Sequence, residues 1–260
     1  MYPYWNIGNF SISMRSFMIN IGSIVGIVVV FCILYRTFIC GNRNKKTIVK
    51  YLLTPCIATA IALVVIGGSV GHLSRVLLWD EHSEGIHYLS YVKNSGGTHF
   101  IGQILVTSVL LPLIFRWVYG RKEMDQVLSC VAFFIPIQHI FSRIGCFLGG
   151  CCYGIPTNGV LGVQFPKSVE EYPVFPSQLF EILLMICIIV VQIRRWKKGK
   201  PLFAITVLYF SIAIFVSELW MHKDGVMYYA GLTSIQYFAI ITGGVSVLLM
   251  IGEYRRRKLQ

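Results

Sequence analysis

Seven long apolar runs, separated by short clusters of Lys and Arg, constrain this chain more than any other feature. About 20 predominantly apolar residues are enough for a helix to cross the roughly 30 Å hydrocarbon core of a bilayer. A helix also satisfies its own backbone hydrogen bonds where no water is present. The sequence therefore predicts an all-α, polytopic membrane protein with about seven transmembrane helices, at residues 17–39, 51–71, 99–119, 127–149, 176–194, 202–221 and 230–251.

The composition agrees with this architecture. Of the 260 residues, 55% are hydrophobic and only 13% are charged, whereas about a quarter of the residues of a soluble domain are charged. Seven spans leave little chain for a separate soluble unit. We therefore expect a single transmembrane domain over residues 1–260.

The distribution of Lys and Arg predicts the topology. Basic clusters follow the first, third, fifth and seventh runs, whereas the connections at 72–98, 150–175 and 222–229 carry acidic residues and few bases. By the positive-inside rule the amino terminus lies outside and the carboxyl terminus lies in the cytoplasm. The net charge of +12 thus reflects topology, and we expect no nucleic acid as a partner. The long outer connections are expected to form re-entrant or interfacial loops.

The segment from His139 to Pro166 begins inside the fourth predicted span and emerges outward, with six glycines and polar residues that are out of place in lipid. Arg143 lies about two turns inside the membrane, where a cation needs a cavity or a partner. Its fork of donors suits a lipid phosphate, so we predict an anion clamp. The alternative is an anchor that snorkels to the headgroups. His139, one turn earlier on the same face, is either a proton donor or a packing residue.

Eight cysteines do not indicate a disulfide framework, because five are scattered singly through apolar runs. The other three, Cys146, Cys151 and Cys152, are clustered. Adjacent cysteines are poor partners at one metal ion, so we expect no metal here. A nucleophilic or redox thiol and simple packing both stay open.

Other polar residues lie within predicted spans. Gln178 and Glu181 at the start of the fifth run and Glu218 near the end of the sixth are expected to face Arg143, with ion pairing to the carboxylates. A structural brace is the alternative. Gln103 and Gln236 are candidates for a cavity or for hydrogen bonds between helices, of which the second is the commoner role.

Two motifs follow one another along the fourth and fifth predicted spans. The second is FPSQLFE at 175–181. The first consists of Arg143, Ile144, Gly145, Cys146, Phe147, Gly150, Tyr153, Gly154, Pro156 and Thr157. In order and spacing these motifs resemble the signatures of the prolipoprotein diacylglyceryl transferase family. Weaker similarity extends from IGNF at the start to GLTSIQ at 231–236, so the resemblance covers nearly the whole chain.

The resemblance implies an activity. The family moves a diacylglyceryl group from phosphatidylglycerol to the cysteine thiol of a lipoprotein precursor, on the outer face of the bacterial cytoplasmic membrane. It implies an anionic phospholipid and a precursor peptide as partners and no cofactor, with Arg143 on the phosphate. Candidate catalytic residues are Arg143, His139, His99 and Glu218. Candidate substrate-binding residues are Arg143, Cys146, Cys151, Tyr153, Gly154, Ser177, Gln178, Glu181 and Gln236.

The chain departs from the family pattern at positions close to the expected chemistry. The family's His in an H-G-G motif aligns with Ile101, and His99 replaces it only if its helix face turns by about 200°. The remaining departures are Arg15 for Tyr, Cys146 for Asn, Cys151 for an acidic residue, Phe175 for His and Ile214 for Arg. The alternative hypothesis is therefore a repurposed, non-catalytic protein that binds phospholipid.

Overall fold

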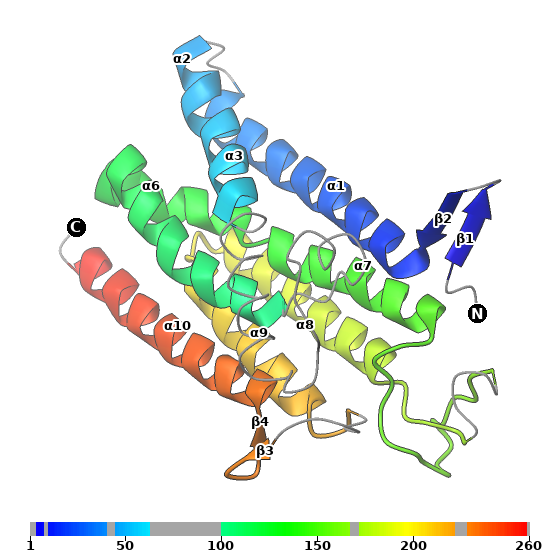
Figure 1. Ribbon diagram of the computed structural model, residues 1–260. Coiled ribbons are helices and arrows are strands. Elements are labelled where there is room, and N and C mark those ends of the chain that lie inside the picture. Colours follow the sequence, from blue (N-terminus) through cyan, green and yellow to red (C-terminus); the bar gives the residue numbers. More distant parts are fainter. Residues whose placement is uncertain are drawn as a thin grey trace, which may run out of the picture.

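The computed structural model describes residues 4–7, 10–40, 45–62, 100–166, 172–221 and 228–258. These residues form a bundle of long helices with two short hairpins (Figure 1). The hairpins are β1 (Tyr4–Ile7) with β2 (Phe10–Ser13) and β3 (Tyr228–Tyr229) with β4 (Leu232–Thr233). The helical segments are α1 (Met14–Leu34), η1 (Tyr35–Ile39), α2 (Lys45–Ile48), η2 (Val49–Leu53), α3 (Thr54–Ala60), α6 (Phe100–Val131), α7 (Phe134–Gly149), α8 (Ser177–Lys197), α9 (Phe203–Ser217) and α10 (Ser234–Lys258).

The all-α fold is confirmed. In the part of the chain that the structure describes, the strands form two short hairpins, one before α1 and one before α10, and the other elements are helices. Five helical stretches are long and apolar enough to cross a membrane, and α9 is a shorter apolar helix. The second predicted span is helical as far as the structure describes it, to residue 62. The five stretches are Met14–Ile39, Gly102–Gly120, Glu123–Gly149, Ser177–Lys197 and Ile235–Arg256.

The outward faces of these helices are apolar, as lipid requires. Ile24, Leu113 and Leu248 are among the large aliphatic side chains that are more than half exposed. The interior holds aromatic and aliphatic residues together with a set of buried polar groups. In a membrane such polar groups face the interior of the bundle or a cavity, so they indicate where a site lies.

Close packing between α1 and α7 depends on two glycines one turn apart. A Cβ on Gly22 would lie 2.6 Å from Cβ of Phe141, and one on Gly26 would lie 2.7 Å from the ring of Phe134. This spacing of small residues lets two helix backbones approach closely in lipid. α7 is thereby held between α1 and α8, both of which it contacts.

Two breaks shape the third and fourth spans. Gly120 has φ 70° and ψ −173° inside α6, so the third span ends there and a new helical direction begins. Further on, Pro136 has no N–H for the carbonyl of Ala132, four residues earlier. Nε2 of Gln192 donates to that carbonyl at 2.9 Å. A buried glutamine on α8 thus satisfies a backbone group that the proline leaves free.

The loop between α7 and α8 lies over one end of the bundle and is held by backbone bridges. Gly154 pairs with Met221 after α9, and Val174 pairs with both Pro156 and Val163. The loop therefore joins the end of α7, the start of α8 and the segment after α9.

Candidate active site

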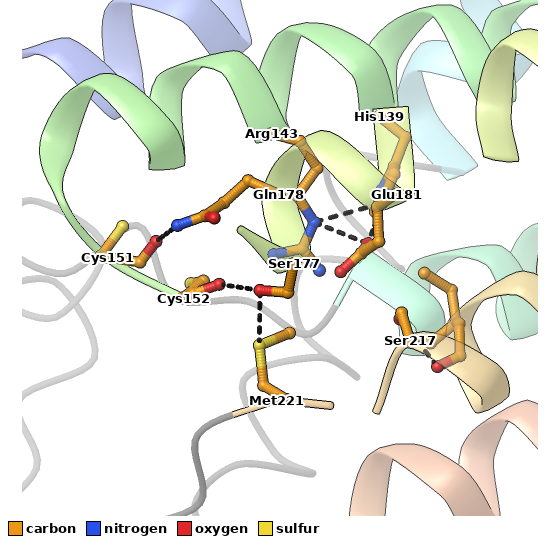
Figure 2. A network of polar contacts seen from close by, with 10 residues as sticks. His139, Arg143, Cys151, Cys152, Ser177, Gln178, Glu181, Ser217 and Met221 are labelled. Atoms are coloured by element: carbon orange, nitrogen blue, oxygen red, sulfur yellow. Dashed lines mark hydrogen bonds and ion pairs between the residues drawn. The ribbon is translucent and has the colours of Figure 1, made fainter. Parts of the chain in front are cut away.

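A buried carboxylate links α7 and α8. One oxygen of Glu181, Oε2, lies 2.7 Å from Nε of Arg143 and 2.7 Å from Nε2 of His139 (Figure 2). The Glu181 side chain is 0% exposed, that of His139 4% and that of Arg143 16%. His139 and Arg143 lie one turn apart on α7, as the sequence predicted, and the predicted pairing of Arg143 with Glu181 is present.

The short contact to Glu181 defines which nitrogen of His139 carries a proton. A carboxylate accepts hydrogen bonds, so Nε2 of His139 carries the proton that it donates. The same nitrogen lies 3.3 Å from Nε of Arg143, which also carries a proton, so that approach contributes proximity and no second hydrogen bond. The ring of His139 packs edge-on against Phe210 at 5.2 Å. His139 therefore holds Glu181 in place.

Several polar atoms beside this pair remain available. Arg143 uses Nε for its hydrogen bond to Glu181, and its two terminal nitrogens make none to the residues that the structure describes. Oε1 of Glu181 and Oε1 of Gln178 are buried acceptors without a donor in the same described residues. Buried polar groups are rarely left unsatisfied in a native protein. Two donors and two acceptors at one place are suited to a polar, anionic ligand.

The start of α8 holds the chain that follows α7. Oγ of Ser177 donates to the carbonyl of Cys152 at 2.7 Å, and Nε2 of Gln178 donates to the carbonyl of Cys151 at 2.7 Å (Figure 2). Both donors are fully buried. α7 ends at Gly149, its cap residue Gly150 has φ 69°, and Cys152 has φ 59°, a region that L residues seldom occupy. Ser177 and Gln178 thus fix an unusual turn.

This turn brings three thiols together. The sulfur atoms of Cys146, Cys151 and Cys152 all lie within 4.8 Å of one another. Adjacent cysteines are expected to be poor partners at one ion, but the positive φ of Cys152 and the end of α7 turn both side chains toward Cys146. Hydrogen bonds with Cys146 and Cys151 hold the pKa of the Cys152 thiol well below its usual range.

Two residues predicted to bind substrate, Gly154 and Tyr153, make packing contacts in the loop. A Cβ on Gly154 would lie 2.5 Å from the carbonyl oxygen of Trp220 and 2.7 Å from that of Phe175, so this glycine permits close approach of backbones. The ring of Tyr153 packs on the buried Phe165 at 5.6 Å.

Glu218 and Gln236 lie at a different junction. Oε2 of Glu218 accepts from Oγ1 of Thr233 at 3.2 Å. Oε1 of Gln236 accepts from the backbone N–H of Thr233 at 2.9 Å, and Oγ1 of Thr233 accepts from the N–H of Gln236 at 3.2 Å. This reciprocal pattern is a capping box at the start of α10. The predicted ion pair of Arg143 therefore forms with Glu181, whereas these contacts of Glu218 join α9 to α10.

His99 lies outside the described residues, and its prediction stays untested. Two further residues, Thr233 and Arg15, received no role from the sequence. Thr233 was overlooked although the T-x-x-Q spacing is itself a capping signal. Arg15 packs its backbone within 3.0 Å of a Cβ built on Gly145, and its charge acts on Cys152 together with that of Arg143. No local signal in the sequence marks that approach.

The model of the prolipoprotein diacylglyceryl transferase family matches residues 3–252. The chain belongs to this family. Among similar family members, one from Clostridium tetani is 25% identical over 167 residues, 60% of this chain and 66% of its own length. One from Rickettsia akari is 31% identical, over 56% of this chain and 54% of its own length. The chain thus spans less than two thirds of these two relatives.

A third family member, from Rickettsia typhi, aligns over most of both chains. It is 27% identical over 231 residues, 85% of this chain and 83% of its own. All three relatives are named phosphatidylglycerol–prolipoprotein diacylglyceryl transferase. Membership in the family agrees with the resemblance that the two motifs carried.

Proposed function

We propose that this protein transfers a diacylglyceryl group from phosphatidylglycerol to the cysteine thiol of a lipoprotein precursor. The observation that carries the proposal is the position of Arg143. It is anchored through Nε on the buried Glu181 at 2.7 Å, and this leaves its terminal nitrogens for an anion. The names of the relatives supply the reaction and its two substrates.

The polar atoms around Arg143 match the headgroup of phosphatidylglycerol. A guanidinium fork binds phosphate oxygens through two parallel hydrogen bonds, which are strong where water is excluded. The terminal glycerol of this lipid has two hydroxyl groups. Oε1 of Gln178 and Oε1 of Glu181 are buried acceptors that suit such donors. The two sets of groups together favour a glycerol headgroup over phosphate alone.

The reaction needs two contributions from the protein. The acceptor thiol loses its proton and its sulfur attacks C3 of the diacylglyceryl group, so a C–S bond forms and the C–O bond to phosphate breaks. Glycerol phosphate leaves with the electron pair, and the thiol proton passes to solvent. The leaving group gains negative charge, which the Arg143 guanidinium stabilises at close range. Glu181 and His139 hold Arg143 in the geometry that this requires.

We also propose that the site lies at the outer face of the cytoplasmic membrane, with the amino terminus outside and the carboxyl terminus inside. The basic clusters after α1, in α8 and in α10 support this orientation through the positive-inside rule. The ends of α7 and α9 and the start of α8 then face outward. Labelling of single cysteines placed at residues 5 and 257 with a membrane-impermeant maleimide, in intact cells, tests it: only residue 5 is expected to react.

The decisive experiment is incubation of the purified protein with phosphatidylglycerol and a lipobox peptide. We expect release of glycerol phosphate and a gain of one diacylglyceryl mass on the peptide. Arg143→Ala should abolish both, because the anion loses its clamp. Arg116→Ala is the matched control, since Arg116 is exposed on α6. Bound lipid without any release or mass gain would instead favour the repurposed lipid-binding protein.

A further inference from the structure

Cys146, Cys151 and Cys152 form a cluster of three thiols near the site, and the proposed reaction assigns no role to it. Cys146 is 1% exposed, whereas Cys151 and Cys152 are partly exposed. All eight cysteines are free thiols. Among the residues that the structure describes, these three are the group of metal-binding side chains with converging ligand atoms.

We propose that Cys146, Cys151 and Cys152 bind a thiophilic divalent cation of the zinc class, and that its fourth coordination position takes the acceptor thiol. The second half of this inference rests on the proposed function, because it concerns the thiol acceptor of that reaction. The first half stands on the geometry of the three sulfurs alone.

The spacing of the sulfurs fits such an ion. Zinc binds thiolate sulfur at about 2.3 Å in tetrahedral geometry, which places its sulfurs about 3.8 Å apart. The three sulfurs here are within 4.8 Å of one another, so side-chain rotations are enough to bring them to an ion. Three protein ligands leave one position open, as in catalytic zinc sites. The partial exposure of Cys151 and Cys152 gives that position a path to a ligand.

The turn that carries two of the ligands is held before any ion binds. Ser177 and Gln178 fix the carbonyls of Cys152 and Cys151, each at 2.7 Å. The N–H of Cys151 donates to the carbonyl of Cys146 at 3.0 Å, which ties the third ligand to the other two. Groups that orient metal ligands in this way preserve affinity, and their loss commonly weakens binding about 10- to 100-fold.

The surrounding charges balance the complex. Three thiolates around a divalent cation carry a net charge of −1, which is costly in a low-dielectric region without a counter-ion. The guanidinium groups of Arg143 and Arg15 both act on this cluster. Hard oxygen-binding cations such as Mg²⁺ are excluded by the sulfur ligands, which select zinc-class and softer ions.

The open position explains how the acceptor is activated. When the acceptor thiol binds, its proton leaves to solvent and its sulfur becomes the fourth ligand, with the total charge changing by −1. The metal-bound sulfur then attacks C3 of the lipid, the C–S bond forms, and glycerol phosphate departs from Arg143. The product thioether is a weaker ligand than a thiolate and dissociates. No oxidant or reductant takes part.

Metal binding is tested first, without any transfer assay. Protein purified without chelator should hold about one zinc ion per chain by elemental analysis. Co²⁺ added to the demetallated protein should give sulfur-to-cobalt charge-transfer bands and the strong visible bands of a tetrahedral site. Each of Cys146→Ser, Cys151→Ser and Cys152→Ser should lose most of this absorption, and Ser177→Ala should weaken Co²⁺ binding about 10-fold. Cys187→Ser, at an exposed position on α8, should change nothing.

The acceptor is tested on the cobalt protein. A lipobox peptide should shift the visible bands, and the same peptide with serine in place of its cysteine should not. No zinc and no charge-transfer band in folded wild-type protein would overturn the site, and so would bands that survive in the triple Cys→Ser variant. Full transfer by metal-free protein would overturn the role in activation and leave the proposed function standing. A peptide-induced shift without transfer would support the site and count against the proposed function alone.

Discussion

Glu181 holds Arg143 through a 2.7 Å contact between its Oε2 and Nε of Arg143, and the carboxylate is completely buried. The geometry leaves the outer nitrogens of the guanidinium free of Glu181. Each charge is also the other's counter-ion in a region where an unpaired charge is costly. The same contact therefore serves both the fold and the placement of the Arg143 guanidinium.

Glu181→Gln should reduce stability and transfer together. The amide keeps the size of the side chain but removes the negative charge. Arg143 and His139, which both donate to Glu181, therefore lose their charged acceptor. Breaking a buried ion pair by removing one partner costs about 3 kcal/mol or more. Thermal unfolding in detergent, followed by tryptophan fluorescence, measures the first effect, and the peptide mass assay measures the second.

The matched change is Glu123→Gln, in the pair between Glu123 and Lys50 at 3.1 Å, where both side chains are about 40% exposed. A surface pair of this kind contributes about 1 kcal/mol or less. If Glu181→Gln unfolded at the same temperature as Glu123→Gln, the buried pair would have no special weight in this fold.

The sequence predicted both the membrane-spanning helices and the ion pair between Arg143 and Glu181. Apolar runs of span length report helices because lipid leaves few other structures. Arg143 and Glu181 were placed opposite each other because a buried charge in lipid demands a partner. The first span was expected from residue 17, whereas α1 begins at Met14, an error of about one turn that hydropathy does not resolve.

The remaining site residues depend on the path of the loops, which hydropathy does not report. Gly154 permits contact with the backbones of Trp220 and Phe175, two segments distant in sequence. The convergence of Cys151 and Cys152 on Cys146 follows from a positive φ at Cys152, which no residue preference predicts for cysteine. The hydrogen bond from Thr233 to Glu218 joins two segments that charge and hydropathy do not place together.

His139 should behave as a positioning residue. Its Nε2–H donates to Glu181 and its side chain is nearly inaccessible, so we expect no proton exchange between His139 and a substrate. His139→Gln, which keeps an N–H donor of similar reach, should retain transfer within about 10-fold, whereas His139→Leu should lose more by leaving Glu181 with one donor fewer. The pH dependence of kcat should be the same in wild type and His139→Gln. Loss of one limb of that profile would identify His139 as a general acid or base instead.

Gly154→Ala should destabilise the loop above the site. The added Cβ would lie 2.5 Å and 2.7 Å from two carbonyl oxygens of the backbone, so the backbone segments must move apart. The hydrogen bonds from Gly154 to Phe175 and from Ile155 to Trp220 would then weaken. We expect a cost of about 1 to 3 kcal/mol and faster proteolysis between α7 and α8. Gly149→Ala is the control, because nothing lies within 4 Å of a Cβ there. Equal stability of the two variants would contradict this assignment.

Thr233 and Gln236 should be energetically coupled, because each satisfies a backbone N–H of the other at the start of α10. Thr233→Val and Gln236→Leu should each cost about 1 kcal/mol, the usual effect of losing a cap. Thr233→Ser keeps the hydroxyl group and should lose far less.

The double variant distinguishes a cap from a substrate contact at Gln236. Once one side chain of the capping box is removed, removing the other breaks fewer hydrogen bonds. The double variant should therefore lose less stability than the sum of the two single losses, by about 0.5 kcal/mol or more. Urea or thermal unfolding in detergent gives the four stabilities of the cycle. Transfer assays on the same proteins should show a KM for phosphatidylglycerol unchanged within about threefold, since that shift corresponds to less than 1 kcal/mol of binding. Additive stabilities together with a raised KM in Gln236→Leu alone would return Gln236 to the lipid site.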